Sequence, residues 1–357
     1  MADIQPSKAL QFPAWTNDNH CLARRVLNCD LWEQLKDFKT SLTSFTINDV
    51  VRSGVAVPTS SNGVYAGDEE CYRLYSQVFE PIIKEYHGMD KIPAHVSNLD
   101  SRCLTSVIHN EASILSTRCR VVRNLYGYGF PPGMSREKRL EVERILVTAL
   151  ESLGGDLSGT YYPYDTMTSS EKQSLIKDGY LFQESDKYQA AAGICRDWPE
   201  GRGIFYNNAK TFLVWVNEED HLRIISMQKG ADVQQVFNRL CRGIHAIDKR
   251  LLNNAQTAFA FDKQYGYLSS CPTNLGTGMR TSVHMRVPNA FNTAAEFKST
   301  CGQLGLDVRG KHGETSEASE KAVCDVSNRQ RMGRTEVELL KILIDGINSL
   351  NQYAISG

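Results

Sequence analysis

The sequence lacks a charge excess, a cysteine cluster and a long apolar run, and each absence argues against a class of protein. Its 40 lysines and arginines nearly balance 41 aspartates and glutamates, for a formal net charge of −1. No long-range attraction to nucleic acid or to an anionic membrane is therefore expected. The ten cysteines include no C-x-x-C pair, which argues against a disulfide or zinc framework and favours reduced thiols in a cytoplasmic protein. No apolar run approaches the roughly 18 residues needed to span a bilayer, and no signal peptide is expected at the N-terminus.

Two familiar nucleotide-binding motifs are also missing. The sequence has no G-x-x-x-x-G-K-[S/T] loop and no H-R-D catalytic triplet, so neither a P-loop nor a protein-kinase architecture is supported. The chain has 357 residues, of which 41% are hydrophobic and 23% charged. This is an ordinary globular composition, and the length is sufficient for two domains.

One stretch, residues 271–288, combines a thiol, hydroxyls and arginines. Its second half alternates, which predicts a strand with one buried face and one polar face. Arg280, Ser282, His284 and Arg286 would share the polar face. Its first half is a loop that begins at Cys271. A loop and strand of this kind could meet a ligand that carries phosphates.

Polarity and periodicity divide the rest of the chain into three segments. Residues 1–95 are expected to be helical, residues 96–112 a linker, and residues 113–357 strands alternating with amphipathic helices. The predicted helices and strands are, in order, helices at 30–39 and 70–86, a strand at 113–122, a helix at 136–153, strands at 211–216 and 222–227, and a helix at 231–251. A Thr-x-x-Glu capping box at Thr335 predicts a final helix, and residues 308–317 predict a mobile loop.

The run Cys-Pro-Thr-Asn-Leu-Gly-Thr at residues 271–277 resembles the signature of the phosphagen (ATP:guanido) kinase family, closest to the arginine kinases. The resemblance continues through residues 159–163, 198–205 and 211–230, and covers most of the chain from about Ser116. It implies an α+β fold with a small all-α N-terminal domain and a larger antiparallel β-sheet domain flanked by helices, of the glutamine synthetase/guanidino kinase-like type. It also implies reversible transfer of the γ-phosphoryl group of Mg-ATP to a guanidino nitrogen, which would buffer ATP.

The resemblance also implies roles for individual residues. The nucleotide would be bound by Arg118, Arg120, Arg223, Arg280 and Arg309 at its phosphates and by His284 at its adenine. Arginine suits phosphate because its planar guanidinium binds two oxygens at once and stays protonated. The catalytic set would be Glu219, Glu314, Cys271 and Arg223. Both glutamates would align the guanidino group, and the thiol, partly ionised with help from Thr273, would touch it. Glu218 could lie in the outer shell of magnesium, which would be bound mainly through the nucleotide.

The resemblance further implies that a loop near the N-terminus caps the amino-acid end of the substrate. Backbone amides of this loop would bind the substrate carboxylate. The loop consists of Ser60, Ser61, Asn62, Gly63, Val64 and Tyr65. The family's usual loop reads Ser-Gly-Val-Gly-Ile-Tyr, so one glycine is replaced. Further departures lie at residues 101–112, at Gly179 and at residues 315–322. The altered 60–65 loop leaves open another guanidino substrate, such as taurocyamine or lombricine. The changes at Gly179 and after Glu314 leave open a nucleotide-binding member without turnover. A monomer or a homodimer is expected.

Overall fold

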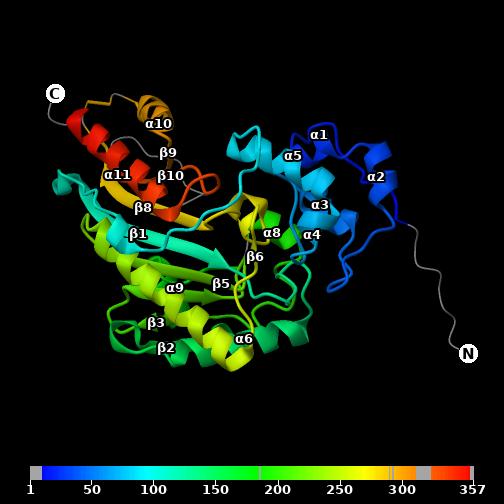
Figure 1. Ribbon diagram of the computed structural model, residues 1–357, viewed down its shortest axis with the longest axis horizontal. Helices are drawn as coiled ribbons and strands as arrows, with labels where there is room; N and C mark the ends of the chain where they lie inside the picture. Colours follow the sequence, from blue (N-terminus) through cyan, green and yellow to red (C-terminus); the bar gives the residue numbers. More distant parts are fainter. Residues whose placement is uncertain (1–9, 185, 289, 292, 311–322, 354–357) are drawn as a thin grey trace, which may run out of the picture.

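A small helical part lies beside a larger part built on one β-sheet (Figure 1). The computed structural model describes residues 10–184, 186–288, 290–291, 293–310 and 323–353. Glu314 and residues 315–322 lie outside the described residues, as does most of the loop predicted at 308–317. Within the described ranges, no helix is long and apolar enough to cross a membrane.

The small part is a cluster of short helices around its own apolar core. Its helices are α1 Leu22–Val26, α2 Cys29–Leu35, α3 Ile47–Ala56, α4 Cys71–Leu74 and α5 Ser76–His87. The capping box of Thr46 and Asp49 starts α3 because each side chain accepts a hydrogen bond from the other residue's backbone N–H. The core of this part does not end with its own helices. Leu268, Leu275 and Met332, which come from the larger part, are buried in the same cluster.

Two predicted helices of the small part are shorter than the apolar spacing indicates. The helix predicted at 30–39 ends at Leu35, and Phe38 lies outside it with 48% of its surface exposed. The helix predicted at 70–86 is broken at Tyr75, whose φ of −110° and ψ of 30° are not helical. The Tyr75 hydroxyl donates to the carbonyls of Phe38 and Phe45, 2.8 Å away in each case. This tertiary contact has no signature in local periodicity.

The larger part is organised by an antiparallel sheet of eight strands in the order β2-β3-β4-β5-β1-β8-β10-β9. The strands are β1 Ile114–Arg123, β2 Gly159–Pro163, β3 Gly203–Asn207, β4 Phe212–Val216, β5 Leu222–Lys229, β8 Met279–Arg286, β9 Leu306–Arg309 and β10 Val323–Asn328. A separate hairpin pairs β6 Phe261–Asp262 with β7 Gly266–Tyr267. Val308 and Arg309 belong to β9, so the first two residues of the loop predicted at 308–317 are in a strand.

Helices cover one face of the sheet (Figure 1). They are α6 Arg136–Glu151, α9 Val233–Ala255, α10 Ala294–Gln303 and α11 Glu336–Tyr353. Alternate strand residues such as Val121, Val214 and Val283 point into the core that these helices share. The predicted capping box of α11 is confirmed, since Thr335 and Glu338 exchange backbone-to-side-chain hydrogen bonds. One face of the sheet is therefore buried against these helices, and the side chains of the other face pack elsewhere.

The second face of the sheet is only partly covered. Near β2 to β5 it packs against an aromatic cluster that includes Tyr164, Phe182 and Trp215. The covering segments include α7 Ser169–Lys177 and the short 3₁₀ turn η4 Tyr164–Thr166. Helix α8 Lys187–Ala191 packs against α3, and the turn η3 Gly155–Leu157 buries Leu157 in the core on the opposite face. Near β1 and β8 the same face carries polar residues. Arg280 and Ser282 on this side of β8 are 8% and 4% exposed. The polar face that was predicted for residues 279–287 is therefore largely shielded from bulk solvent.

The segment predicted as a linker, residues 96–112, is packed against the larger part. It contains the turns η1 Ser101–Cys103 and η2 Glu111–Ser113. The buried carboxylate of Glu336 accepts hydrogen bonds from the Ser97 hydroxyl and the Asn98 backbone N–H, at 2.9 and 2.6 Å. These contacts fix the segment to the start of α11. The domain limits themselves stay a prediction.

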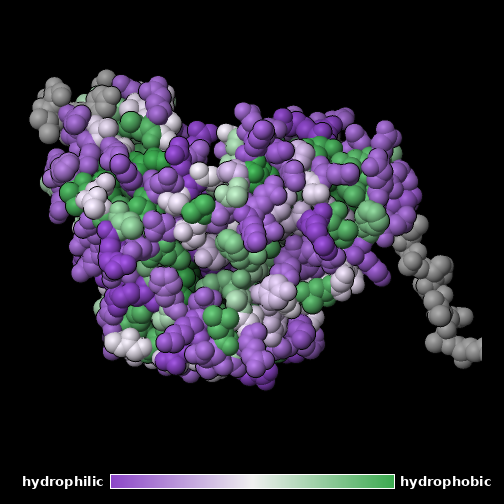
Figure 2. Space-filling view, in the orientation of Figure 1, coloured by the Kyte–Doolittle hydropathy of each residue, from purple (hydrophilic) through white to green (hydrophobic). Residues whose placement is uncertain are grey.

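The view in Figure 2 shows a largely polar surface on which apolar residues form several separate areas. The exposed large apolar side chains come from distant points in the sequence, such as Phe38, Tyr126 and Leu252. Scattered apolar residues of this kind are normal on a protein surface. The prediction of a monomer or a homodimer is therefore not decided by this face.

Candidate functional site

A cavity of about 880 Å³ lies over the polar side of β1, β5 and β8. The small part contributes residues 59–62 and Tyr65, and the segment from Ile176 to Gln189 forms another wall. Most of the residues predicted for the site line this cavity. They are Ser60, Ser61, Asn62, Tyr65, Arg118, Arg120, Glu218, Glu219, Arg223, Cys271, Arg280, His284 and Arg309. Gly63 and Val64 are buried behind the wall.

Strand pairing brings the arginines together. Antiparallel pairing of β1 with β8 sets Arg120 opposite Arg280 and Arg118 opposite Ser282. Pairing of β1 with β5 sets Val122 opposite Arg223. Because side chains alternate along a strand, Arg118 and Arg120 point to the same face as Arg280. Three segments that are far apart in sequence thus place cations on one surface.

Arg118 has polar atoms that the described protein does not satisfy. Its Nε and Nη2 atoms are inaccessible to solvent and have no hydrogen-bond partner among the described residues. Its guanidinium lies 5.5 Å from the centroid of the Trp215 ring. Burial, and then the nearby charge of Arg223, lowers the pKa of Arg118 to about 10. Unpaired buried cationic groups are costly, so this arrangement favours an anionic ligand.

The other arginines of the sheet differ in how they are paired. Burial and the charges of Arg223 and Arg280 lower the pKa of Arg120. Arg280 is paired with Asp325 and also donates to the Ser327 hydroxyl at 3.1 Å. Burial acts to raise the pKa of Asp325, but the charges of Arg280 and His284 and the hydrogen bonds from Ser282 and Arg280 together outweigh it, and the net pKa lies below the usual value. His284 lies 3.4 Å from the same carboxylate.

The β4–β5 hairpin tip holds two glutamates and is buried rather than solvated. Asn217 adopts a left-handed conformation with φ of 55° and donates to the Gly201 carbonyl at 2.7 Å. Asp220 accepts from Asn124 and from the Ser270 backbone N–H, both at 2.6 Å. His221 is held between the backbones of Leu125 and Gly129. These buried contacts fix the tip on both sides of the glutamates.

The two glutamates of this tip share Arg223: Glu218 forms an ion pair with it, and Glu219 accepts hydrogen bonds from it and from Asn274. Arg223 Nη2 lies 2.7 Å from Glu218 and 3.2 Å from Glu219 Oε2. Asn274 Nδ2 donates to the same Oε2 atom at 3.3 Å. Glu219 is only 8% exposed, so its carboxylate is held in place by two neighbours at one oxygen.

Arg331 is a cavity residue that sequence reasoning missed. It follows β10 in a loop with no recognisable motif, so no local signal could have identified it. It donates to the Thr273 carbonyl at 3.0 Å and is paired with the side-chain oxygen of Asn274. Burial is the main cause that lowers its pKa, and Arg280 adds to it. Arg331 thus supports the 271–277 loop from the side of the arginines on the sheet.

Cys271 lies at the junction of the two parts. Its Sγ atom lies 3.1 Å from the Thr273 hydroxyl and accepts from Asn62 Nδ2 at 3.4 Å. Burial, and then the charge of Glu219, raises the pKa of the thiol to about 12, although both hydrogen bonds act in the opposite direction. The partly ionised thiol expected from the resemblance is therefore not favoured in the protein alone. A cation beside Sγ would shift this balance toward the thiolate.

The loop of residues 60–65 is rigidly tied to its surroundings. The N–H groups of Gly63, Val64 and Tyr65 donate to Ser60 Oγ, Asn62 Oδ1 and the Val50 carbonyl. Of these loop residues only Gly63 has a positive φ, 78°. A serine at position 61 therefore causes no backbone strain.

The last predicted residues lie at the edge of the described region. Arg309 ends β9, faces the cavity and lies 3.4 Å from Asp307. Glu314 lies outside the described residues, so its predicted place opposite Glu219 stays a prediction. Gly179, where the family often has a nucleotide contact, lines the far wall with a φ of 73°.

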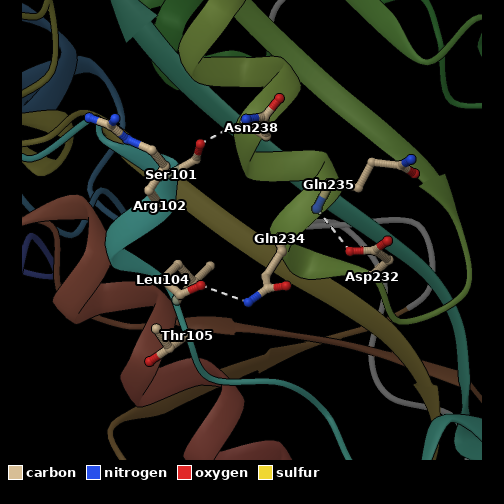
Figure 3. Close-up of a pocket in the computed structure, with 8 residues that line it drawn as sticks. All are labelled: Ser101, Arg102, Leu104, Thr105, Asp232, Gln234, Gln235 and Asn238. Carbon is tan, nitrogen blue, oxygen red and sulfur yellow. Dashed lines mark hydrogen bonds between the residues drawn. The ribbon is translucent and has the colours of Figure 1, made fainter.

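A second, more open hollow of about 610 Å³ lies between residues 101–105 and the start of α9. Figure 3 shows Asn238 donating to Ser101 and Gln234 donating to the Leu104 carbonyl across it. Arg102 in its rim is already paired with Asp100. These hydrogen bonds fasten the connecting segment to α9, and the arginine-lined cavity is the better candidate for chemistry.

Several arginines that can bind an anion lie beside a buried carboxylate and a thiol. This arrangement is suited to a phosphotransferase with a cationic acceptor. Comparison with known proteins agrees. Residues 17–84 match the ATP:guanido phosphotransferase N-terminal domain, and residues 141–353 match the ATP:guanido phosphotransferase C-terminal catalytic domain. The chain belongs to the ATP:guanido phosphotransferase family, as its sequence motifs indicated.

Individual relatives support this assignment. The chain is 45% identical over 348 residues to an arginine kinase of Anthopleura japonica, covering 95% of this chain and 48% of that protein. It is 41% identical over 339 residues to an arginine kinase of Drosophila melanogaster, covering 94% and 93%. The chain thus spans about half the length of the first relative and most of the second.

Solved structures of related enzymes share the fold. A crystal structure of lombricine kinase matches with a TM-score of 0.91 and 37% identity, covering 97% of this chain and 94% of that chain. The duplicated taurocyamine kinase from Schistosoma mansoni matches with a TM-score of 0.86 and 34% identity, covering 95% and 47%. The predicted fold class, a helical N-terminal domain followed by a larger antiparallel sheet domain with helices, is confirmed.

Proposed function

We propose that this protein is an arginine kinase, which transfers the γ-phosphoryl group of Mg-ATP reversibly to the guanidino group of L-arginine and so buffers ATP. The single observation that carries the proposal is the unsatisfied guanidinium of Arg118 in the same cavity as Glu219 and Cys271. An anion at Arg118 and a cation at Glu219 would lie on one continuous surface. Relatives named arginine kinase, at 41–45% identity, favour arginine as the acceptor.

The nucleotide would bind along the arginine surface. Arg118, Arg120 and Arg280 would contact phosphate oxygens, with Arg223 and Arg309 beside the transferring group. Such contacts neutralise charge that spreads over the phosphoryl oxygens in the transition state. His284, at the open end of β8, would stack on the adenine. Magnesium is part of the substrate here, because it enters with ATP and keeps most of its water, and Glu218 would lie in its outer shell.

The acceptor would be positioned by the hairpin tip and the 271–277 loop. The carboxylate of Glu219, held through its Oε2 atom, would accept hydrogen bonds from the guanidinium and fix its plane. Glu314 would do the same from the other side. A guanidinium has a pKa above roughly 12, and a glutamate near about 4.3 is a weak base for it. Alignment therefore comes first, and a carboxylate takes the proton only as the phosphorus–nitrogen bond forms.

The far end of the acceptor would meet the 60–65 loop. The N–H groups of Gly63, Val64 and Tyr65 already donate within the protein, so a substrate carboxylate would be bound by the amides of Ser61 and Asn62, which lie nearer the cavity. Tyr65 and Tyr188 line the same end. Taurocyamine has a sulfonate, and lombricine a phosphodiester, where arginine has its carboxylate. Each group needs a differently shaped binding site, so this short loop would determine which of the three substrates binds.

The test is ADP production from Mg-ATP with a panel of L-arginine, D-arginine, taurocyamine, glycocyamine, lombricine and creatine. Fast turnover confined to L-arginine is the expected result. Preference for taurocyamine or lombricine would keep the reaction and replace the substrate. If no substrate of the panel gives ADP production, but ADP still binds in a calorimetric titration, the protein is a nucleotide-binding member without turnover. A cytoplasmic location, and a monomeric or homodimeric state, are proposed from the sequence alone.

A further inference from the structure

The side chain of Asn62 makes a contact that the proposed reaction does not yet use. Its Nδ2 atom donates to Cys271 Sγ at 3.4 Å, although the two residues lie 209 positions apart. Both are nearly inaccessible to solvent, with exposed fractions of 6% and 4%. The contact thus joins the substrate loop of the small part directly to the thiol of the larger part.

The orientation of the Asn62 amide is set by its other end. The Val64 backbone N–H donates to Asn62 Oδ1 at 2.9 Å, and a donor must face an oxygen. The NH₂ group must therefore point toward Cys271. The backbone carbonyl of Asn62 also accepts from the Ala23 N–H at 3.0 Å. The side chain is held at both ends of its amide, and the backbone of the same residue is held at a third point, so the side chain can move only with the loop.

We propose that Asn62 is a positioning residue that makes the ionisation of Cys271 depend on the seating of the 60–65 loop. An N–H donor stabilises a thiolate more than a neutral thiol, because the charged sulfur is the stronger acceptor. Thr273 supplies the only other side-chain contact of Sγ within 4 Å hydrogen-bonding reach among the described residues. With the loop seated as it is here, the donor already lies at the sulfur, and any displacement of the loop would remove it.

The surroundings give this donor more influence than it would have in water. Burial and the Glu219 carboxylate both raise the pKa of Cys271, and the hydrogen bond from Asn62 is among the contacts that lower it. The family loop quoted above has valine at this position, which can donate nothing. The dependence on Asn62 is therefore a property of this chain. Its importance for phosphoryl transfer rests on the proposed function, but the contact itself does not.

The test measures alkylation of Cys271 in the full-length protein without substrate, by peptide mapping between pH 7 and 10. The Asn62→Asp variant keeps the size of the side chain and an acceptor for Val64, but replaces the donor with a carboxylate. We expect Cys271 to react about tenfold more slowly at each pH, which corresponds to a pKa about one unit higher. The exposed Cys103, mapped in the same sample, should react at an unchanged rate. Asn62→Val, which removes the donor without adding charge, should show a smaller decrease.

Two controls separate ionisation from access. Iodoacetamide and N-ethylmaleimide differ in size, so an equal fold decrease with both reagents marks a change in thiolate fraction. Ser60→Ala loosens the loop through its contact with Gly63 without altering the Asn62 side chain, and it should lower the rate by an equal factor with both reagents. An unchanged rate in Asn62→Asp, or a decrease that differs between the reagents, would overturn the proposal. Since no substrate is needed, failure of arginine turnover in the panel would be a separate result.

Discussion

Glu219→Gln gives the sharpest test of how the acceptor is positioned. Arg223 Nη2 and Asn274 Nδ2 both donate to the Oε2 atom of Glu219, at 3.2 and 3.3 Å. A glutamine can keep these two partners only if its amide oxygen takes the Oε2 position. Its NH₂ group then takes the Oε1 position, where it would present hydrogens to a cationic guanidinium. The existing contacts of the protein would therefore hold the amide in the wrong orientation for the proposed acceptor.

The magnitude follows from the hydrogen bonds lost. A hydrogen bond to a charged group contributes about 1.5–3 kcal/mol. Loss of two such contacts between Glu219 and the guanidinium of the acceptor, partly offset by rearrangement, costs about 3–4 kcal/mol of transition-state stabilisation. At about 1.4 kcal/mol for each factor of ten, turnover should fall roughly 10²–10³-fold. Affinity for ADP should stay within about threefold, because the proposed phosphate contacts are made by the arginines of the sheet.

The assay is ADP production at saturating L-arginine and Mg-ATP, with ADP affinity measured by calorimetric titration. Glu218→Gln is the matched control, since it removes one charge from the same hairpin tip and the same arginine. It should lower turnover less than tenfold. Normal turnover in Glu219→Gln would refute the role of Glu219. A parallel loss of ADP affinity would show instead that Glu219 acts mainly by holding Arg223.

Three further predictions concern the nucleotide, the thiol and stability. Arg280→Ala should weaken ADP binding about 10–100-fold by calorimetry, because it removes a charge-assisted contact and leaves Asp325 buried without its partner; unchanged affinity would count against a phosphate contact. Alkylation of Cys271 should be blocked by arginine plus ADP, and equal labelling with and without them would mean that the thiol is remote from the ligands. Burial lowers the pKa of His87 from 6.5 to about 4, so the unfolded chain takes up a proton first as pH falls. Stability from this group is present above pH 6.5 and lost progressively toward pH 4, by about 2 kcal/mol at pH 5. The drop in Tm between pH 7.5 and 5 should be smaller in His87→Gln, and an equal drop would contradict this reasoning.

The sequence predicted those parts of the site that lie on regular strands. The alternation in β8 placed Arg280 and His284 on one face, and the Arg118 and Arg120 pair behaved in the same way on β1. Period-two alternation depends only on local backbone geometry, so it can be read from residues a few positions apart. The strand order was beyond such reasoning, because the pairing of β1 with both β5 and β8 joins segments about a hundred positions apart or more.

The misses share one physical cause, which is contact over long sequence distances. Arg331 enters the cavity from an irregular loop, and the break at Tyr75 reflects hydrogen bonds to Phe38 and Phe45. The thiol pKa of Cys271 depends on burial that no motif encodes. The linker predicted at residues 96–112 rests on broken periodicity and stays a prediction, and its contacts could not be read from local sequence. Only the fold shows that Glu336 accepts its hydrogen bonds.

The shared core of the small part has a consequence for the order in which the chain can fold. During synthesis, helices α1 to α5 emerge early, yet Leu275 and Met332, which complete their apolar cluster, emerge much later. Glu336, which holds Ser97 and Asn98, comes later still. The small part and the segment after it therefore reach their final packing only after Glu336 has left the ribosome. Until then their apolar faces stay exposed, a state in which chaperones and proteases can act on them.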